Sequence, residues 1–375
     1  MFPARMPGRR GLLLRHIFIL HPALLKKQKD SFAENFFLIP KFYFPFLLLS
    51  AFLLCSCHKK QKTISFYYWK TSFHLTPTEI NTIRNNNVTR IYVRYFDIDM
   101  PPGDAQPKPV APISFDTTRI FFEVTPVIYI KNRVFLTLDS TTIPGLCNQV
   151  FKMVTAINKS IHKSPDEIQF DCDWTVTTKE KYFLFLNRYK EISNQIVSAT
   201  IRLHQIKYPE ITGIPPVDTA VLMYYNMGKI GAGDASSIYE KSIANQYNSF
   251  IKKYPLKLKA ALPIFAWGQL ISDDRVFKLL NGMNYSDFIN DSNFVLIYKN
   301  RFKVIHGNFH GGYYFKQNDE VKIEQVSEKD LMEMIDQLNE ESSGHINQLI
   351  FFDLDETNLE LYDKNIFKKM VDRLN

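Results

Sequence analysis

The stretch 167–203, EIQFDCDWTVTTKEKYFLFLNRYKEISNQIVSATIRL, decides the fold class. It begins with a short apolar run at 167–173, continues through an amphipathic segment at 179–195, and ends in a second apolar run at 196–203. The first and last segments are typical of buried strands, and the middle one is typical of a helix. Strands that alternate with helices in this way form β–α–β units, whose strands are parallel in one sheet.

The same alternation extends over most of the chain. Helical patterns begin at Thr76, where Thr-Pro is typical of a helix start, and after Pro144, and they also cover 179–195, 236–254 and 364–374. Eight apolar runs are expected to be strands: 65–73, 88–99, 125–130, 167–173, 196–203, 221–227, 258–267 and 346–354. Eight such units in one α/β domain predict a (β/α)₈ TIM barrel over 65–375. An open doubly wound sheet is the alternative.

The segment between the seventh and eighth strands is too long for a single helix. Short strand-like runs occur at 294–304, 311–315 and 321–325, and Ser327 is placed to begin the next helix. We therefore expect a small β-rich insertion at about 290–326.

The first 57 residues have the features of a leader. Phe42–Leu54 is an apolar run of thirteen residues after Lys41, too short to span a bilayer of roughly 30 Å but suited to a signal peptide. Leu54-Cys55-Ser56-Cys57 follows, and it resembles the lipobox cut by lipoprotein signal peptidase. This resemblance implies a lipid on Cys57, a tether at 58–64 and a membrane-anchored protein of the cell envelope. An uncleaved membrane anchor is the alternative.

The charge of the chain is concentrated in this leader. The net charge of the whole chain is +8, and the leader, with eight basic and two acidic residues, carries +6 of it. The remainder therefore carries only +2 and shows no basic stripe, so a nucleic-acid partner is not expected. Cys147 and Cys172 are the cysteines that remain after the leader, and the sequence leaves their pairing open.

Polar and aromatic residues follow the predicted strands at their carboxyl ends. In TIM barrels this is the end at which active sites are built. The candidates are Trp69 after the first strand, Asp97 and Asp99 after the second, Asp171 and Asp173 after the fourth, Arg202 and His204 after the fifth, Tyr225 and Asn226 after the sixth, Trp267 after the seventh, and Asp353, Asp355 and Glu356 after the eighth.

Asp171 and Asp173 are two residues apart in one strand and therefore share a face, about 6–7 Å apart. Their mutual repulsion should raise the pKa of one of them, which would suit acid catalysis. Strand-end Asp residues that cap the following helices are the alternative. Oxygen ligands could also bind Ca²⁺ or Mg²⁺. The sequence contains no HExxH and no Cys/His spacing for zinc, so neither metal nor cofactor is predicted.

The segment 168–174, IQFDCDW, resembles the DxxDxDxE strand of the chitinase-like family 18 glycoside hydrolases. The segment 223–227, MYYNM, is similar to the Met-x-Tyr-Asp segment of that family, and the chain also resembles glycosidase-like lipoproteins of Bacteroidetes-type bacteria. The resemblance implies a TIM barrel that takes a carbohydrate, with Asp171 and Asp173 as the middle acids. The catalytic Glu of the motif is Thr175 here, and its leading Asp is Ile168.

Two hypotheses about function follow. The first is a cell-envelope glycoside hydrolase with Asp171, Asp173, Asp355 and Glu356 as catalytic residues, in which Asp355 or Glu356 replaces the missing acid. Its substrate-binding residues would be Trp69, Asp97, Asp99, Arg202, His204, Tyr225, Asn226, Trp267 and Asp353. The second is a catalytically inactive surface lipoprotein that binds a glycan or a protein. In either case we expect Asp171, Asp173 and Asp355 to point into one cleft.

Overall fold

The computed structural model describes residues 62–374, apart from 102, 105, 117–119, 343 and 345. The leader, Cys57 and the tether up to residue 61 lie outside the described residues, so the expected lipid anchor remains a prediction. Within the described part, no helix is both long and apolar enough to cross a bilayer.

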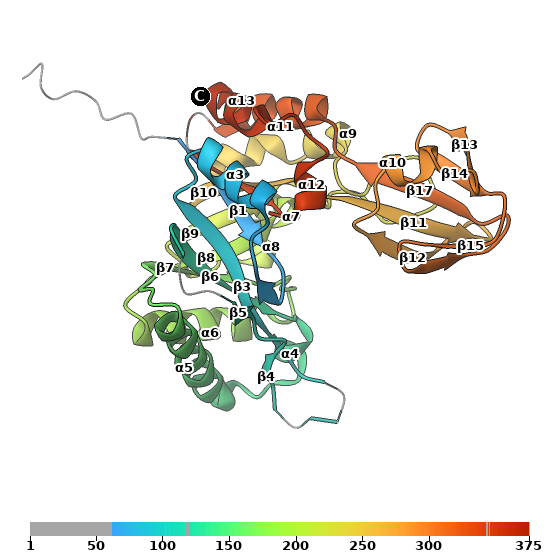
Figure 1. The fold of residues 1–375 in the computed structure, drawn as a ribbon. Helices are drawn as coiled ribbons and strands as arrows, with labels where there is room; N and C mark the ends of the chain where they lie inside the picture. The colour runs from blue at the N-terminus through green and yellow to red at the C-terminus, as the bar shows by residue number, and fades with distance from the viewer. Residues whose placement is uncertain are drawn as a thin grey trace, which may run out of the picture. The chain divides into compact units, whose positions relative to one another are not determined.

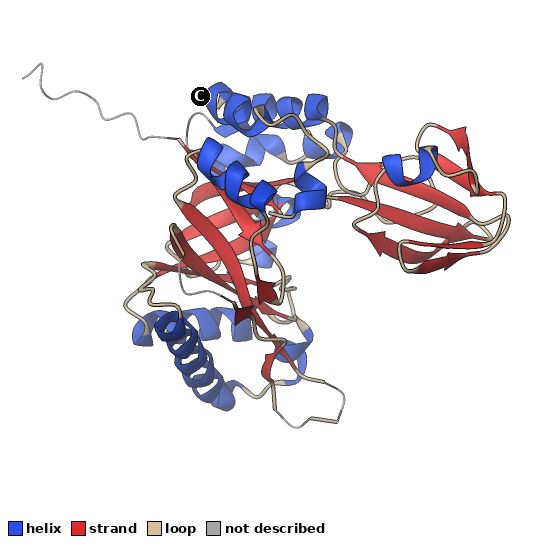
Figure 2. Ribbon diagram, viewed as in Figure 1, coloured by secondary structure: helices blue, strands red, loops and turns tan. Residues whose placement is uncertain are grey.

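Eight parallel strands form a closed barrel (Figures 1 and 2). They are β1 (Thr63–Tyr68), β3 (Arg90–Asp99), β6 (Glu123–Ile130), β7 (Glu167–Asp171), β8 (Ile196–Arg202), β9 (Thr219–Met223), β10 (Lys257–Pro263) and β18 (Gln348–Phe352). The barrel closes at β1, where Ser65 pairs with Arg90 of β3 on one side and with Ile350 of β18 on the other. The predicted (β/α)₈ barrel is therefore confirmed, and the open sheet is excluded.

Helices follow most of the strands and cover the outside of the barrel (Figure 2). They are α3 (Pro77–Asn85), α4 (Arg133–Thr137), α5 (Ile143–Ser160), α6 (Lys179–Ile192), α7 (Leu203–Lys207), α8 (Pro209–Thr212), α9 (Lys241–Ala244), α11 (Glu328–Ser342), α12 (Glu356–Leu359) and α13 (Ile366–Arg373), with 3₁₀ turns η2 (Ser140–Thr142) and η3 (Asn248–Lys253). As expected, Thr76 caps α3, in a reciprocal capping box with Glu79. Short strands β4 (Lys108–Val110), β2 (Ser72–Phe73) and β5 (Ser114–Phe115) border the barrel.

The helix expected at 236–254 is not continuous. Only α9 and η3 form there, and polar side chains of the segment bond to neighbouring elements. Asn248 accepts a hydrogen bond from Tyr224, and Asn245 accepts one from Gln337 of α11. Cys147 and Cys172, the cysteines of the described part, are free and buried, and the Cys147 thiol donates to the Phe185 carbonyl at 3.5 Å.

The insertion between β10 and β18 is larger than predicted and begins at Ala266 rather than near 290. Its sheet has the order β12-β11-β17-β14-β13, from β11 (Ala266–Ser272), β12 (Arg275–Asn281), β13 (Phe294–Tyr298), β14 (Arg301–Val304) and β17 (Glu320–Gln325). A hairpin, β15 (Asn308–His310) with β16 (Tyr313–Phe315), and α10 (Ser286–Ile289) complete it. The run 258–267 is mostly apolar and is expected to be one strand, but its first part pairs within the barrel, whereas Ala266 and Trp267 pair with β17. Trp267 accordingly belongs to β11 and not to the barrel.

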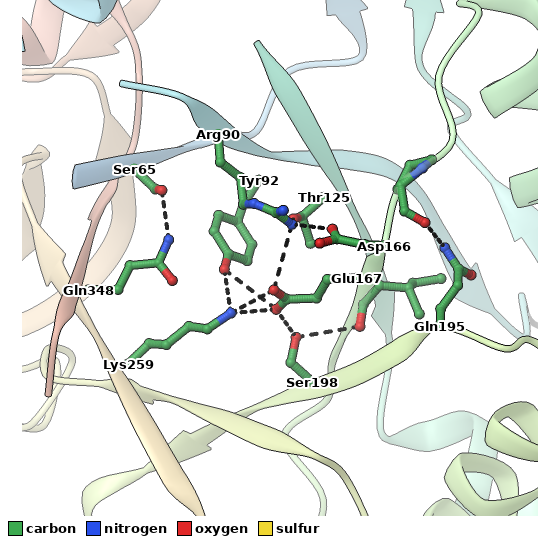
Figure 3. Close-up of polar contacts among 12 residues, drawn as sticks. Ser65, Arg90, Tyr92, Thr125, Asp166, Glu167, Gln195, Ser198, Lys259 and Gln348 are labelled. Atoms are coloured by element: carbon green, nitrogen blue, oxygen red, sulfur yellow. Dashed lines mark hydrogen bonds and ion pairs between the residues drawn. The ribbon is translucent and has the colours of Figure 1, made fainter. Parts of the chain in front are cut away.

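The N-terminal end of the barrel interior contains a charged network (Figure 3). The Lys259 ammonium donates to both Glu167 oxygens, at 2.7 and 2.6 Å, and to the Tyr92 hydroxyl at 2.7 Å. Ser198 donates to the same carboxylate at 2.7 Å, and Arg90 pairs with Asp166 at 2.7 Å. Every charge in this network has a partner, which a buried charge requires. Because active sites of TIM barrels lie at the opposite, carboxyl-terminal end of the strands, this network is assigned to stability rather than catalysis.

Candidate active site at the barrel mouth

A pocket of about 670 Å³ opens at the carboxyl ends of the strands. Residues at or after the carboxyl ends of six barrel strands contribute to it, and so does the inserted sheet. Its lining is Trp69, Tyr129, Asp171, Met223, Tyr225, Asn226, Phe265, Ala266, Trp267, Asn281, Gly282, Phe352, Asp353, Asp355, Thr357 and Asn358. The pocket therefore combines aromatic rings with carboxyl and carboxamide groups.

Asp171 is the last residue of β7 and lies at the floor of this pocket. Its Oδ1 accepts a hydrogen bond from Thr200 of β8 at 2.6 Å. Burial, and then the negative charge of Asp173, raise the pKa of Asp171 to about 6. The repulsion expected between the two acids is present, but removal from water is the larger cause.

Asp173 has a different environment. It forms a two-pronged ion pair with Arg202, in which Nη2 lies 2.8 Å from Oδ2, and it is half exposed outside the pocket lining. The predicted cleft therefore contains Asp171 and Asp355 but not Asp173. Arg202 and His204 line a small neighbouring cavity of about 70 Å³, together with Tyr225 and Asn226. Burial, followed by the charge of Arg202, lowers the pKa of His204.

The acids after β18 differ in their partners. Asp353 lines the pocket and accepts a hydrogen bond from Asn358 at 2.6 Å. Burial, and then the charge of Asp355, raise its pKa to about 7. The peptide bond between Phe352 and Asp353 is cis.

Asp355 accepts from the Thr357 backbone as the N-cap of α12 and pairs with Lys70 at 2.9 Å. Burial raises its pKa, but the bonds from Lys70 and Thr357 outweigh burial and hold it below its usual value. Asp355 is therefore an ionised group, unsuited to donate a proton. Glu356 accepts a hydrogen bond from Thr78 of α3 at 2.5 Å and is not part of the pocket lining. Neither expected replacement for the missing acid has the environment of a proton donor, whereas Asp353 does.

The acids after β3 lie outside the pocket lining. Asp99 is buried and binds Lys131 at 2.6 Å and Arg133 Nη2 at 2.8 Å. The Arg133 hydrogen bonds, together with Lys131, hold the pKa of Asp99 well below its usual range. Asp97 accepts a hydrogen bond from Arg94 Nε at 2.7 Å. Both carboxylates have cationic partners within the fold.

Aromatic side chains form much of the pocket wall. The Phe352 ring lies 5.4 Å from Trp69, 5.8 Å from Tyr225 and 5.9 Å from Phe265, measured between centroids. Phe265 lies 5.2 Å from Trp267. Trp69, Tyr225 and Trp267 were expected from the sequence. Phe265 and Phe352 were not, although both lie at strand ends and could have been found by the same rule.

Two polar features bear on binding and chemistry. Asn226 has a left-handed backbone, with φ of 53°, and within the described chain its Oδ1 has no hydrogen-bond partner. This oxygen is itself shielded from solvent, so the carboxamide would have to turn before a ligand hydroxyl could bind to it. Thr175 lies outside the pocket lining, and its backbone N–H donates to Thr178 before α6.

Clusters of side chains that could ligate a metal ion are absent from the part of the chain that the structure describes. No group of three or more His, Cys, Asp or Glu side chains in that part of the chain is arranged to hold an ion. The site is thus described by its carboxyl and aromatic groups.

Comparisons with known proteins address the fold. No family model matches the chain, and no curated protein sequence does. The spore cortex-lytic enzyme SleL of Bacillus cereus has a similar structure, with a TM-score of 0.52 and 15% identity over 84% of this chain and 75% of that one. Chitinase ChiA74 from Bacillus thuringiensis gives 0.46 and 9% over 78% and 66%, and a chitinase-like agglutinin from Robinia pseudoacacia gives 0.48 and 12% over 82% and 99%. The first likeness shows a shared fold, the TIM barrel described above.

Proposed function

We propose that the barrel mouth is a glycan site and that the chain is a glycoside hydrolase-like protein of the cell envelope. The observation that carries this proposal is a single pocket, in which aromatic walls surround two carboxyl groups with pKa values raised to about 6 and about 7. Its volume of about 670 Å³ is in the range of small-ligand sites.

The lining of the pocket can bind both the apolar faces and the hydroxyl groups of a sugar. Rings such as Trp69 and Trp267 offer flat apolar surfaces for the C–H faces of a pyranose, while the indole N–H at the edge of each ring can donate a hydrogen bond to another group of the protein. Asp353, Asn226 and Asn281 offer oxygen and nitrogen atoms for its hydroxyls. A pocket with mostly apolar walls and a few placed polar groups is typical of small-molecule recognition.

The two raised pKa values assign different roles. Because burial raises its pKa to about 7, Asp353 keeps its proton close to neutral pH and can donate it to a glycosidic oxygen as a general acid. Asp171 is mostly ionised at that pH and can stabilise positive charge in an oxocarbenium-like transition state. The Tyr225 hydroxyl is close enough to sense both acids. Burial and then the charge of Asp171 raise its pKa, with smaller contributions in the same direction from Asp173 and Asp353 and an opposing one from Arg202.

The substrate class and the location belong to the same proposal. SleL is named as a spore cortex-lytic enzyme, which makes glycans of bacterial envelopes the first class to test. The lipobox-like segment before Cys57 would anchor the barrel to a membrane near such glycans.

The test is a panel of soluble oligosaccharides from chitin, bacterial peptidoglycan and plant polysaccharides, assayed for turnover and for binding. The wild-type chain, Asp353→Asn and Asp171→Asn are compared, since both substitutions are nearly isosteric. We expect turnover of at least one class, reduced about 10²-fold or more in each variant. Turnover unaffected by both substitutions would reject this pocket as the active site.

One observation favours a second candidate, a barrel that binds a glycan without hydrolysing it. Thr175 occupies the position of the catalytic Glu in the motif that this strand resembles, and a hydroxyl cannot replace a carboxylic acid as a proton donor. In that case the same panel would give binding without turnover, and Trp267→Ala would abolish the binding.

A further inference from the structure

A second buried ion pair lies in the inserted sheet, beside the pocket. Lys322 and Glu324 of β17 are each 1% exposed, and Lys322 Nζ lies 2.7 Å from Glu324 Oε1. The same ammonium donates to the Ala235 carbonyl at 2.7 Å. A buried ion pair costs desolvation and often contributes little net stability, so it raises the question of what else it does.

The other oxygen of Glu324 holds two groups in place. Trp267 Nε1 donates to Oε2 at 2.9 Å, and the Ser237 backbone N–H donates to it at 3.1 Å, with the Ser237 hydroxyl as a further donor. Trp267 and Glu324 are direct partners across β11 and β17. Burial raises the pKa of Glu324, but the bonds from Lys322, Ser237 and Trp267 hold it below its usual value. The acceptor is therefore a carboxylate, which makes these bonds stronger than neutral ones.

These contacts join two elements that both reach the pocket. Residues 226–238 follow β9, and Asn226 at their start lines the pocket. Arg301 of β14 also donates to this loop, at the Ala232 carbonyl. The inserted sheet supplies Ala266, Trp267, Asn281 and Gly282 to the lining. Because the indole N–H is held by Glu324, its ring plane is fixed while it remains in the wall of the pocket.

We propose that Glu324, held by Lys322, is a positioning residue of the glycan site, which orients the Trp267 ring and fastens the loop 226–238 to the inserted sheet. The insertion is then one wall of the site rather than an accessory domain. This inference rests on the proposed function, since it identifies the residue that holds Trp267 in the orientation needed to stack on a sugar ring.

The test replaces the pair by apolar residues of similar size, in Lys322→Met/Glu324→Leu. Such replacements of buried pairs are often neutral for stability, so the chain should remain folded. The matched control is Glu167→Leu/Lys259→Met, which removes the ion pair at the opposite end of the barrel. Trp267→Phe is the third variant; it keeps a ring but lacks the N–H, and it leaves both ion pairs intact.

Affinity is measured for the oligosaccharide that binds the wild-type chain best. We expect about tenfold weaker binding for the Lys322/Glu324 variant and for Trp267→Phe. Combining these substitutions in one protein should cause no larger loss, because they break the same contact. Binding by the Glu167/Lys259 control should be unchanged. Wild-type affinity in the Lys322/Glu324 variant would overturn the inference. If that variant does not fold, wild-type affinity in Trp267→Phe would overturn it.

A second readout does not depend on any sugar. The Trp267 indole N–H signal in a ¹⁵N spectrum, assigned by its loss in Trp267→Phe, should be protected from solvent exchange in the wild type and exposed in the Lys322/Glu324 variant. If the wild type binds no glycan but this signal behaves as expected, the proposed function fails while the positioning contact stands. Equal protection in both proteins would refute the contact itself.

Discussion

Asp353 and Asp355 leave the same end of β18, yet only Asp355 has a cation beside it: Lys70 Nζ lies 2.9 Å from its Oδ2. Asp353 has the neutral Asn358 as its hydrogen-bond donor. As a result, the pKa values of two carboxyl groups only two residues apart shift in opposite directions. The pKa of Asp353 is raised to about 7, and that of Asp355 is lowered. Neighbouring carboxyl groups whose environments separate their pKa values are typical of acid–base sites.

The first prediction separates these two acids by their kinetics. Asp353→Asn should lower turnover of the substrate by about 10²–10⁴-fold, because the proton donor is lost. Asp355→Asn should change turnover by less than about tenfold, since an amide can still cap α12. Both variants are assayed as kcat across pH, and the alkaline limb should disappear only in Asp353→Asn. A larger loss in Asp355→Asn would return the acid role to Asp355.

The second prediction concerns stability against pH. A carboxyl group whose pKa is raised in the folded state binds its proton more tightly there. Its contribution to the free energy of unfolding is therefore fully present below the unfolded-state pKa of about 3.9, and it is lost as the pH rises through the folded-state pKa. For Asp353 this loss spans about pH 4 to 7. Asp353→Asn should therefore be more stable than wild type at about pH 8, by on the order of 2–4 kcal/mol, with the difference shrinking toward about pH 4. Urea unfolding at both pH values measures this; a pH-independent difference would contradict it.

The third prediction concerns the opposite end of the barrel. Lys259→Met alone removes the nearest cation from the buried Glu167 carboxylate and leaves only Arg90, 3.8 Å away, so it should destabilise the chain by about 3–5 kcal/mol. Glu167→Leu/Lys259→Met should recover most of that loss. Thermal or urea unfolding gives the comparison, with glycan affinity unchanged in the double variant. Equal destabilisation in the single and double variants would show that the charges themselves are needed.

The fourth prediction concerns the leader. The chain expressed with its first 57 residues in a bacterial host should incorporate a labelled fatty acid at Cys57 and partition into detergent. Cys57→Ala should incorporate none, and Cys55→Ala serves as the matched control because it keeps the acylated position. Equal label in the wild type and Cys57→Ala would reject the lipid anchor.

Much of the fold could be predicted because each barrel strand has a local pattern of apolar residues and most of the strands have a helix after them. The predicted seventh strand, 258–267, extends past the observed end of β10 at Pro263, because apolar residues continue beyond that point and only the strand pairing reveals the break. The early part of the insertion was missed for the same reason.

The site was harder to predict, because the roles of its residues depend on distant partners. Strand-end position correctly located Asp171, Tyr225 and Asp353 at the mouth. Nothing local indicated that Arg202 would neutralise Asp173, or that Lys70, far earlier in the chain, would neutralise Asp355.

The most direct test of the central claim is the position of a bound sugar, in a crystal structure of the protein soaked with the best-binding oligosaccharide. We predict a sugar ring stacked within about 4 Å of Trp69 or Trp267, with a hydroxyl or the glycosidic oxygen hydrogen-bonded to Asp353 or Asp171. An oligosaccharide bound elsewhere on the chain, with none in the pocket at the barrel mouth, would contradict the account.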